Sequence, residues 1–330
     1  MGIIHLFTSL LVLSFVFSFN SQAQDKIAVD ANIFGKLPET TNVKISPDGT
    51  KLLMFQNYQG RKILVTRSLT DPSAKQNGIP PFENQEFIWA RWANNERIIA
   101  GVRFAARGNF SEFRDRIFSI DTVETRLISM KWDGEDVLNP IRINPKRRRQ
   151  SQIQDNVVDM LMDEPNHVLV GLDYHEQFER GVYKIDIRSD KIPRRVVKSR
   201  PIIQSWYSDS DGIVRFGQGE TDREGSIKAR NVAYYRKSED SPWITLYDFD
   251  SINEDEPYYF SGFADDPNII YVMKDDENGR RSAYTYNVDT DEFLEKIAST
   301  DQYDITGLMF NDEGELTGYN FYDKQPRMVF

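Results

Sequence analysis

The sequence contains no cysteine and only three histidines, at His5, His167 and His175. The absence of cysteine excludes disulfides, thiolate metal sites, thiol nucleophiles and a lipid-modified N-terminal cysteine. The scarcity of histidine leaves very few candidates for a general base. The composition therefore argues against a complete enzyme, and the sequence predicts no catalytic, metal-binding or cofactor-binding residue in this chain.

Positive charge is also in deficit, because 41 Lys and Arg face 51 Asp and Glu, a formal charge of −10. Binding to a phosphate backbone needs a basic face, so this excess of acid argues against nucleic acid as the main partner. Hydrophobic residues make up 39% and charged residues 28% of the chain. That balance excludes a polytopic membrane protein and a disordered chain. A length of 330 residues fits two domains or one large all-β domain.

The segment Met1–Ala23 lacks Asp, Glu, Lys and Arg altogether. Its apolar stretch, 6–19, is shorter than the ~20 residues that span a bilayer as a helix. Ser21 and Ala23 place small residues at the −3 and −1 positions of a signal-peptidase site. We predict a cleavable signal peptide at 1–23, cut after Ala23, and a periplasmic or secreted mature protein with no membrane contact. An uncleaved anchor is the alternative.

Past residue 24 the chain shows almost no sustained helical periodicity. Short runs rich in Val, Ile, Tyr and Phe alternate with turn clusters, which is typical of antiparallel strands. The clearest unit joins the run 43–45 to the run 52–55 through the turn Ser46-Pro47-Asp48-Gly49. In such a turn Pro presets φ, the Asp side chain caps the backbone and Gly takes the position with positive φ.

Comparable turns recur roughly 45–70 residues apart, at Asn95, Pro165, Asp211, Asp266 and Asp312. A four-stranded unit with a period of about 40–50 residues is typical of a β-propeller blade. We therefore predict an all-β fold for residues 24–330, a β-propeller of four-stranded blades. Five to six blades are present, as in an incomplete seven-bladed ring. A β-sandwich is the alternative, but its turns recur every 8–12 residues without a longer period.

Three local features of the repeat are open to more than one interpretation. The run 156–163 occupies the place of an inner strand, although its apolar residues would also fit one face of a helical turn. The runs 116–122 and 126–130 are predicted as two strands separated by a turn after Asp121. The longest gap between repeats is attributed chiefly to an insertion at 133–155.

The third strand of the sixth unit, 327–330, reaches the last residue of the sequence. A propeller closes by joining its first and last blades, and an unpaired sheet edge is prone to aggregation. We therefore expect this chain to be the N-terminal part of a longer polypeptide. Closure of a six-bladed ring by residues 30–41 is the alternative.

Several segments resemble the propellers of the prolyl oligopeptidase family of serine peptidases, in particular its exported bacterial dipeptidyl- and acylaminoacyl-peptidase branch. The segments are Ser46–Leu52, Ala90–Arg97, and Gln154–Asp159 with Pro165–Leu169. The resemblance implies a propeller, commonly of seven blades, over a C-terminal α/β-hydrolase domain that carries a Ser-Asp-His triad. In that family the propeller restricts access, so that short peptides rather than folded proteins reach the nucleophile.

The sequence departs from that family in lacking the Gly-x-Ser-x-Gly pentapeptide around a hydrolase nucleophile. Strand–helix alternation is also missing after residue 260, so no triad residue is assigned. The resemblance then implies an inactive chain whose partner is a hydrolase domain in cis, with short peptides as substrates of the parent enzyme. Two alternatives are a free-standing periplasmic propeller that binds a protein or glycan, and a propeller hydrolase with its active site in the central channel.

His167, Asp173 and His175 could suggest a metal site. A spacing of eight residues places the two imidazoles on one side of a strand but too far apart for one ion, and we place His167 at a turn and His175 in the loop after it. Acidic clusters resemble calcium loops superficially but lack the closing Glu, so we interpret them as solvated hairpin turns. These clusters are Asp209–Gly212, Asp275–Gly279 and Asn311–Gly314.

Three further motifs have structural interpretations. The basic run Lys146-Arg147-Arg148-Arg149 is interpreted as an exposed loop of the insertion, with contact to a carboxylate or partner as the alternative. Trp89 and Trp92, three residues apart on one strand, should point to opposite faces and pack between blades. The run 217–219 (Gly-Gln-Gly) lacks the helix start that a phosphate-binding loop needs.

Overall fold

The computed structural model describes residues 35, 38–71, 73–111, 117–144, 146, 151–176, 178–221, 230–250 and 252–330, without the side chains of 107–111, 117–121 and 221. Residues Glu39–Phe330 form one compact unit. The predicted signal peptide and its cleavage site lie outside the described residues, and so does most of the 30–41 segment. Within the described ranges, no helix is long and apolar enough to cross a membrane.

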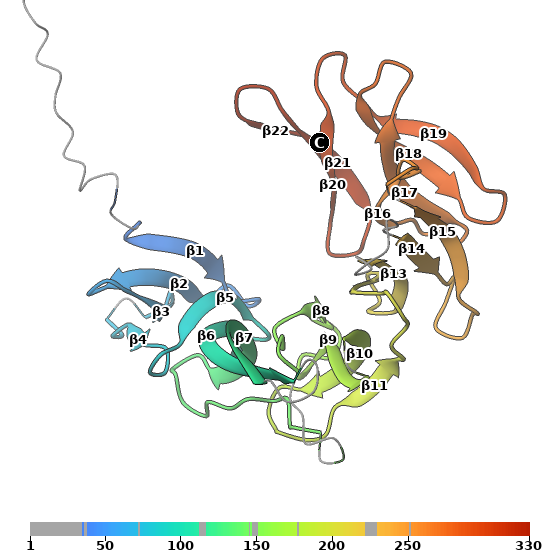
Figure 1. The fold of residues 1–330 in the computed structure, drawn as a ribbon. Coiled ribbons are helices and arrows are strands. Elements are labelled where there is room, and N and C mark those ends of the chain that lie inside the picture. The colour runs from blue at the N-terminus through green and yellow to red at the C-terminus, as the bar shows by residue number, and fades with distance from the viewer. Residues whose placement is uncertain are drawn as a thin grey trace, which may run out of the picture. The chain divides into compact units, whose positions relative to one another are not determined.

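Strands make up all the regular structure of the described residues, and they form six antiparallel sheets (Figure 1). The first sheet contains β1(Thr40–Ile45), β2(Lys51–Tyr58), β3(Arg61–Ser68) and β4(Asn77–Ile79), and the second β5(Glu86–Trp92), β6(Arg97–Ser111) and β7(Ile117–Lys131). The third contains β8(Val157–Asp159), β9(His167–Glu176), β10(Glu179–Asp186) and β11(Arg194–Val197). The fourth contains β12(Ser205–Ser208), β13(Val214–Thr221), β14(Arg230–Tyr235) and β15(Ile244–Asp250). The fifth contains β16(Tyr259–Phe263), β17(Ile269–Asp275), β18(Arg281–Asn287) and β19(Glu292–Ala298), and the sixth β20(Ile305–Phe310), β21(Leu316–Tyr322) and β22(Pro326–Val329).

Each sheet is a meander in which every strand pairs with the next one along the chain. The second sheet has three strands, and the place of a fourth is taken by one bridge, in which Ser129 and Leu138 exchange backbone hydrogen bonds of 2.9 and 2.8 Å. In the described part of the chain, no strand of the first sheet pairs with a strand of the sixth. The predicted β-propeller of five to six blades in an incomplete ring is therefore confirmed, with six sheets of which four are four-stranded and two are three-stranded in the described residues.

Consecutive sheets pack face to face because successive residues of a strand point to opposite faces. In β6, Ile98 contributes to the apolar cluster shared with the first sheet, and Ile99 to the cluster shared with the third. In β9, Val168 likewise faces the second sheet while Leu169 faces the fourth. Such strands are buried on both sides, which explains why they are continuous apolar runs in the sequence and do not alternate with polar residues.

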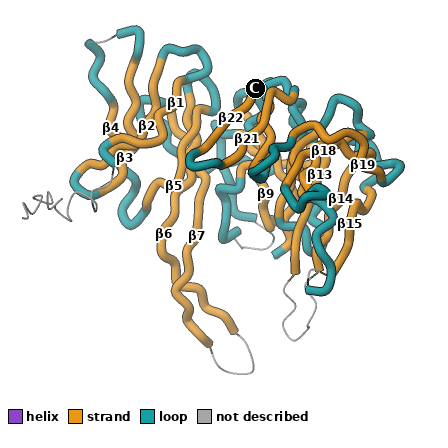
Figure 2. The backbone as a smooth tube through the Cα atoms, turned by 90° about the horizontal axis from the view of Figure 1, so that it is seen from above, coloured by secondary structure: helices purple, strands orange, loops and turns teal. Residues whose placement is uncertain are grey.

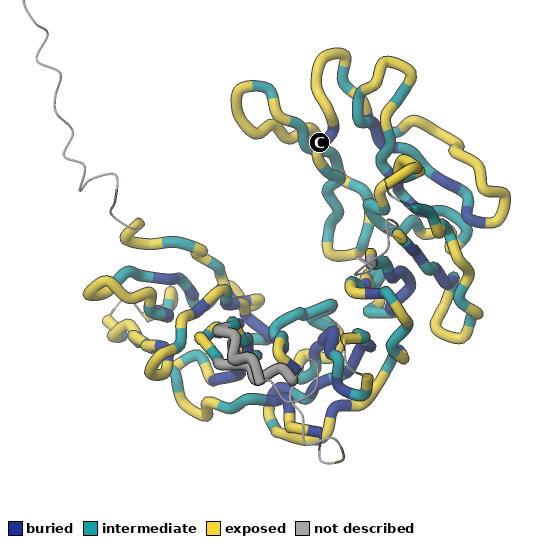
Figure 3. The backbone as a smooth tube through the Cα atoms, in the orientation of Figure 1, coloured by how far each residue is buried: buried dark blue, intermediate teal, exposed yellow. Residues whose placement is uncertain are grey.

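Five apolar clusters join the six sheets in chain order, and buried positions concentrate on the strands while turns are exposed (Figure 3). The clusters contain Leu53 with Ile98, Ile99 with Val168, Leu169 with Trp206, Phe216 with Ile270, and Ala283 with Ile305. Burying a large apolar side chain stabilises a fold by ~1.5–3 kcal/mol. Inter-sheet packing is thus the main stabilising contribution in a chain without disulfides.

The placement of Trp89 and Trp92 on opposite faces of one strand is confirmed. Trp92 belongs to the cluster between the first and second sheets, and Trp89 packs against the cluster between the second and third. The indole nitrogen of Trp92 donates to the carbonyl of Lys44 at 3.3 Å, and that of Trp89 to Asp155 Oδ2 at 3.0 Å. Each tryptophan therefore fixes its strand to a neighbouring segment by both packing and a hydrogen bond.

The prediction of two separate strands at 116–122 and 126–130 is wrong. Both runs belong to β7, which pairs with β6 without a break from Arg97↔Lys131 to Ser111↔Ile117. The resulting hairpin extends beyond the other strands of its sheet (Figure 2). The Asp-Thr pair at 121–122, which has the residues of a turn, is accommodated within a regular antiparallel ladder. Together with the 133–155 insertion, this hairpin accounts for the long gap between the second and third repeats.

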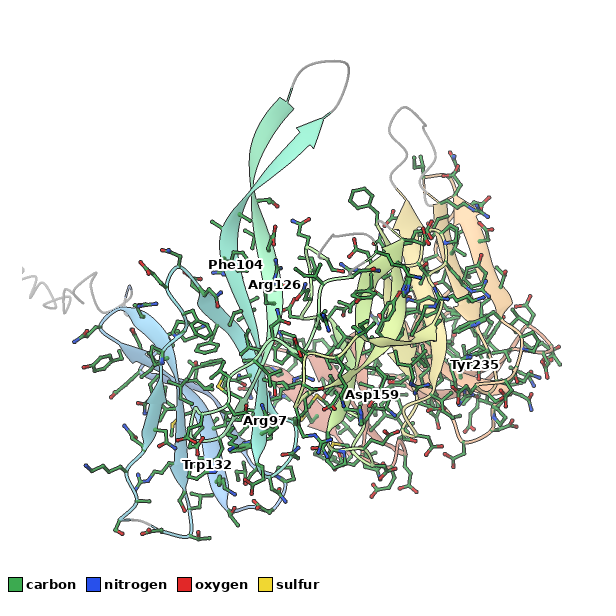
Figure 4. All side chains as sticks on the ribbon, turned by 90° about the horizontal axis from the view of Figure 1, so that it is seen from below. Arg97, Phe104, Arg126, Trp132, Asp159 and Tyr235 are labelled. Atoms are coloured by element: carbon green, nitrogen blue, oxygen red, sulfur yellow. The ribbon has the colours of Figure 1, made fainter. Side chains whose placement is uncertain are left out.

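The end of the 133–155 insertion crosses the base of this hairpin. Gln152 accepts a hydrogen bond from the backbone N–H of Thr125 at 2.9 Å, and the N–H of Gln154 donates to Thr125 Oγ1 at 3.1 Å. Further along the hairpin, the Arg126 guanidinium lies over the Phe104 ring at 5.0 Å (Figure 4). The end of the insertion is therefore hydrogen-bonded to β7 of the second sheet.

Two smaller expectations also have clear outcomes. The run 156–163 begins with the strand β8, so the strand interpretation is confirmed over the helical turn, but β8 ends at Asp159. Leu161 has φ of 48°, which terminates the extended conformation. The placement of His175 in a loop is wrong, because the ladder of β9 and β10 continues to Glu176↔Glu179 and includes it in the strand.

The glycines of the run 217–219 allow close packing. A Cβ atom at Gly217 would lie 2.5 Å from the indole ring of Trp206, and one at Gly219 would lie 1.9 Å from the carbonyl oxygen of Ile202. These contacts explain why both positions lack a side chain within β13. The run 217–219 therefore lies within the strand β13, where its glycines serve packing.

We expect Gly219→Ala to destabilise the protein by about 2–3 kcal/mol, since the clashing atom belongs to the backbone and cannot move aside cheaply. The measurement is urea unfolding followed by circular dichroism. Gly78→Ala is the matched control, because its Cβ would make an ordinary contact of 3.7 Å with Ile63. Equal stability of the two variants would contradict this prediction.

Candidate functional site

The turns that follow the first strands of successive sheets contain polar groups that link one sheet to the next. In the first of them, Asp48 Oδ1 accepts hydrogen bonds from Ser46 Oγ at 2.7 Å, the Thr50 N–H at 3.0 Å and Thr50 Oγ1 at 2.7 Å. These bonds hold the pKa of Asp48 below its usual range. Gly49 takes φ of 72°, as the sequence predicted for this turn.

These turns are joined to one another across the sheets. The backbone N–H of Asp48 donates to Asn95 Oδ1 at 2.9 Å. Asn94 Nδ2 donates to the carbonyl of Pro165 at 2.6 Å, which links the second sheet to the third. Between the third and fourth sheets, the hydroxyl of Ser208 donates to Asp159. Hydrogen bonds at these turns and at the adjacent strand ends therefore link each of the first four sheets to the next.

A cavity of about 650 Å³ lies where the corresponding turns of the fourth, fifth and sixth sheets meet, and we call it the turn pocket. Its apolar wall contains the rings of Tyr207, Phe260, Phe263 and Phe310. The Phe260 and Phe263 rings pack edge to face with centroids 4.9 Å apart. The Phe310 side chain occupies the space above Gly262, where a Cβ would lie 2.4 Å from it. These contacts hold the aromatic wall in place.

Carboxylates surround the opening of the turn pocket. Asp209 is half-buried, whereas the other members are exposed. The set consists of Asp209, Asp211, Asp265, Asp312 and Glu313. With one arginine, Arg215, in the lining, the charged side chains of the turn pocket are predominantly negative.

Arg215 is buried beneath the turn pocket and is fully engaged by its neighbours. Its guanidinium contacts Asp209 Oδ2 at 3.3 Å and also donates to the hydroxyl of Tyr235. It lies over the ring of Phe263 at 5.0 Å. The hydroxyl of Tyr235 (Figure 4) in turn donates a hydrogen bond to the carbonyl of Pro267 at 2.7 Å. Arg215 thus neutralises Asp209 and supports the aromatic wall, and the exposed carboxylates are left without this cation.

The two histidines that the sequence offered as metal ligands, His167 and His175, contact Glu164 and Tyr183. His175 Nδ1 lies 2.7 Å from Tyr183 Oη, and the two rings stack with centroids 5.5 Å apart. Burial raises the pKa of Tyr183 to about 12, so its hydroxyl remains protonated and can donate to the imidazole at neutral pH. His167 Nδ1 lies 3.5 Å from Glu164 Oε2. These contacts indicate packing roles. Among the described residues, no three His, Asp or Glu side chains are arranged to hold a metal ion.

The acidic clusters form the hairpin turns that the sequence predicted. In the turn between β17 and β18, Asp276 Oδ1 accepts hydrogen bonds from the N–H groups of Arg280 and Asn278 at 3.1 and 2.9 Å. Lys296 Nζ lies 3.3 Å from its other oxygen. The two N–H donors, together with Lys296, lower the pKa of Asp276 to about 2.

Asp276 should therefore make stability depend on pH. Its folded-state pKa lies below the ordinary value of 3.8, so its contribution is present above about pH 4 and is lost as pH falls towards 2. We expect Asp276→Asn to flatten the fall of the thermal unfolding midpoint over that interval. Parallel curves for the two proteins between pH 5 and pH 2 would show that this turn contributes nothing to acid stability.

The basic run is described only at Lys146, which is exposed at a turn, and 147–149 lie outside the described residues. For 147–149, the exposed loop stays a prediction and contact with a carboxylate or partner stays its alternative. The turn pocket was not predicted from the sequence, although the sequence indicated all three of its turns, at Asp211, Asp266 and Asp312. The usable signal was their equivalence in the repeat, because equivalent turns of consecutive blades lie side by side.

No protein-family model matches the sequence, and no curated protein matches it. Solved structures with a similar fold include the Pyrococcus horikoshii acylaminoacyl peptidase, at 13% identity over 88% of this chain and 45% of that chain, with a TM-score of 0.47. The β-propeller domain of the Trilobed protease from Pyrococcus furiosus is also similar, at 13% identity over 88% of this chain and 84% of that domain (TM-score 0.43). Dihydro-heme d1 dehydrogenase NirN is similar as well, at 13% identity over 88% of this chain and 54% of that chain, with a TM-score of 0.46. This chain spans less than half of the acylaminoacyl peptidase, and likenesses at these TM-scores carry no argument about function.

Proposed function

We propose that residues 39–330 are the propeller of an exported serine peptidase of the prolyl oligopeptidase type. In this proposal the propeller shapes the entrance through which short peptides reach a C-terminal α/β-hydrolase domain. The observation that carries it is the position of the family-like segments of the sequence. They lie at equivalent places in consecutive sheets and bond to one another.

Residues of the family-like segments take part in each of these bonds. The turn within Ser46–Leu52 donates to Asn95, which belongs to Ala90–Arg97. Asn94 of the same segment donates to Pro165, the first residue of Pro165–Leu169. Trp89, just before the second segment, donates to Asp155 in Gln154–Asp159. The segments that resemble the peptidase family therefore contribute hydrogen bonds between neighbouring blades. This supports a shared propeller architecture rather than a chance match of turn residues.

The general geometry of propellers supports the proposed gating role. The blades of a propeller surround a central channel. In the family that this sequence resembles, the propeller admits short peptides but not folded proteins. A hydrolase beneath such a passage would be protected from folded proteins. The catalytic groups would come from the hydrolase domain, because this sequence holds no Gly-x-Ser-x-Gly from which to assign a nucleophile.

The coding sequence beyond Phe330 tests the proposal. We expect the reading frame to continue into alternating strands and helices, with a Gly-x-Ser-x-Gly pentapeptide followed by an Asp and then a His. A stop codon directly after Phe330, or a continuation without the pentapeptide, would contradict the proposal. Either result would favour a free-standing propeller that binds a protein or glycan.

A further inference from the structure

We propose that the turn pocket binds arginine-containing peptide segments, with guanidinium groups held between its aromatic wall and its exposed carboxylates. The proposal rests on the proposed function only in taking peptides as the molecules that this propeller meets. The volume of the turn pocket, about 650 Å³, lies within the ~300–1,000 Å³ of typical small-ligand sites.

The opening of the turn pocket carries negative charge that the described residues leave uncompensated. Asp211, Asp265 and Asp312 are exposed, and within the described residues no basic side chain lies within 4.0 Å of their carboxylates. Arg215, the one cation of the lining, is buried and paired with Asp209. Several carboxylates around one cavity create a negative electrostatic potential there, which attracts a cationic group.

The wall of the turn pocket suits a guanidinium better than an ammonium. Phe263 already receives the guanidinium of Arg215 over its ring at 5.0 Å. Phe260 stacks one face on Phe216. Phe260, Phe310 and Tyr207 all line the cavity and are at least partly exposed, so they add aromatic surface to its wall. A planar guanidinium stacks on such faces while donating to carboxylates at its edge, and the apolar stem of an arginine side chain packs against the rings.

The turn that supplies two of the carboxylates is held independently of them. The N–H of Gly314 donates to the carbonyl of Asn311 at 3.1 Å, and the N–H of Glu315 donates to Asn311 Oδ1 at 2.8 Å. The side chains of Asp312 and Glu313 are therefore available to a ligand, and neutralising them should leave the turn intact.

The test is a titration of the 330-residue chain with a fluorescent hexapeptide that contains two arginines and is acetylated and amidated at its ends. Blocking both ends removes the terminal charges, so that the side chains carry all the charge of the peptide and determine the salt dependence of binding. We expect saturable binding that weakens as ionic strength rises from about 0.05 to about 0.5 M. The same peptide with citrulline in place of arginine should bind at least about tenfold more weakly.

Variants locate the binding. Asp312→Asn with Glu313→Gln should weaken the arginine peptide about five- to tenfold, and Phe310→Leu about threefold. The matched control Glu292→Gln with Asp301→Asn removes two exposed charges outside the turn pocket and should change affinity less than about twofold. The two double charge variants should unfold at the temperature of the parent chain.

Equal affinity for the arginine and citrulline peptides would overturn the proposal. Equal weakening by the two double variants would also overturn it, as would the absence of saturable binding. None of these results bears on the reading frame beyond Phe330, so failure of this inference is distinguishable from failure of the proposed function.

Discussion

Phe216→Ala is expected to lower the free energy of unfolding by about 3–5 kcal/mol. Phe216 is fully buried in the cluster that joins the fourth and fifth sheets. Its ring stacks on Phe260 with centroids 4.0 Å apart and an interplanar angle of 11°. Truncation would remove this contact and leave a cavity between two sheets. Chemical unfolding of the 330-residue chain followed by circular dichroism measures the loss.

Leu294→Ala is the control for this prediction, because Leu294 is 54% exposed on the outer strand β19. We expect it to change stability by no more than about 0.5 kcal/mol. If Phe216→Ala were as mild as the control, the two sheets would not depend on their shared cluster, and the account of inter-sheet packing would be wrong.

The second large effect is expected at Asp209, whose replacement by alanine should cost about 3 kcal/mol. The side chains of Asp209 and Arg215 are 12% and 7% exposed, and removing one partner of a buried pair leaves the other charge uncompensated. Asp209 Oδ1 also accepts the N–H of Ile213 at 2.9 Å, so the turn loses its cap. Unfolding in urea again gives the loss of free energy.

Two further variants separate these causes. Asp209→Asn keeps an acceptor for Ile213 and removes the charge, so we expect it to retain most of the loss seen with alanine. Asp211→Ala, on the same turn but exposed, should change stability by less than about 0.5 kcal/mol. Full stability of Asp209→Asn would mean that Arg215 does not need its carboxylate.

Much of the fold could be predicted because its strands and turns are specified locally. The turn Ser46-Pro47-Asp48-Gly49 has the side-chain bonds and positive φ that its residues require. Apolar runs such as 98–102 and 168–170 are continuous because both faces are buried between sheets. The spacing of Trp89 and Trp92 gave their opposite faces directly.

The hairpin of β6 and β7 could not be predicted, because a turn and a ladder compete for the same residues at 121–122. Isolated Asp and Thr favour a turn, whereas here backbone pairing with β6 continues through both positions. Tertiary pairing of this kind is not visible in local composition.

The turn pocket could not be predicted for a related reason. Its carboxylates at Asp209, Asp265 and Asp312 come from three blades, and each by itself is an ordinary turn residue. Only the packing of one blade on the next brings them around one cavity. Sequence reasoning reached the turns but not their convergence.

Labelling with a fluorophosphonate probe tests most directly whether Glu39–Phe330 is the propeller of a serine peptidase. An antibody against these residues captures the native polypeptide from its source, and the probe reports a reactive serine in it. We predict covalent labelling of the captured polypeptide and none of the isolated 330-residue chain. A captured polypeptide that remains unlabelled, or labelling of the 330-residue chain itself, would contradict the account.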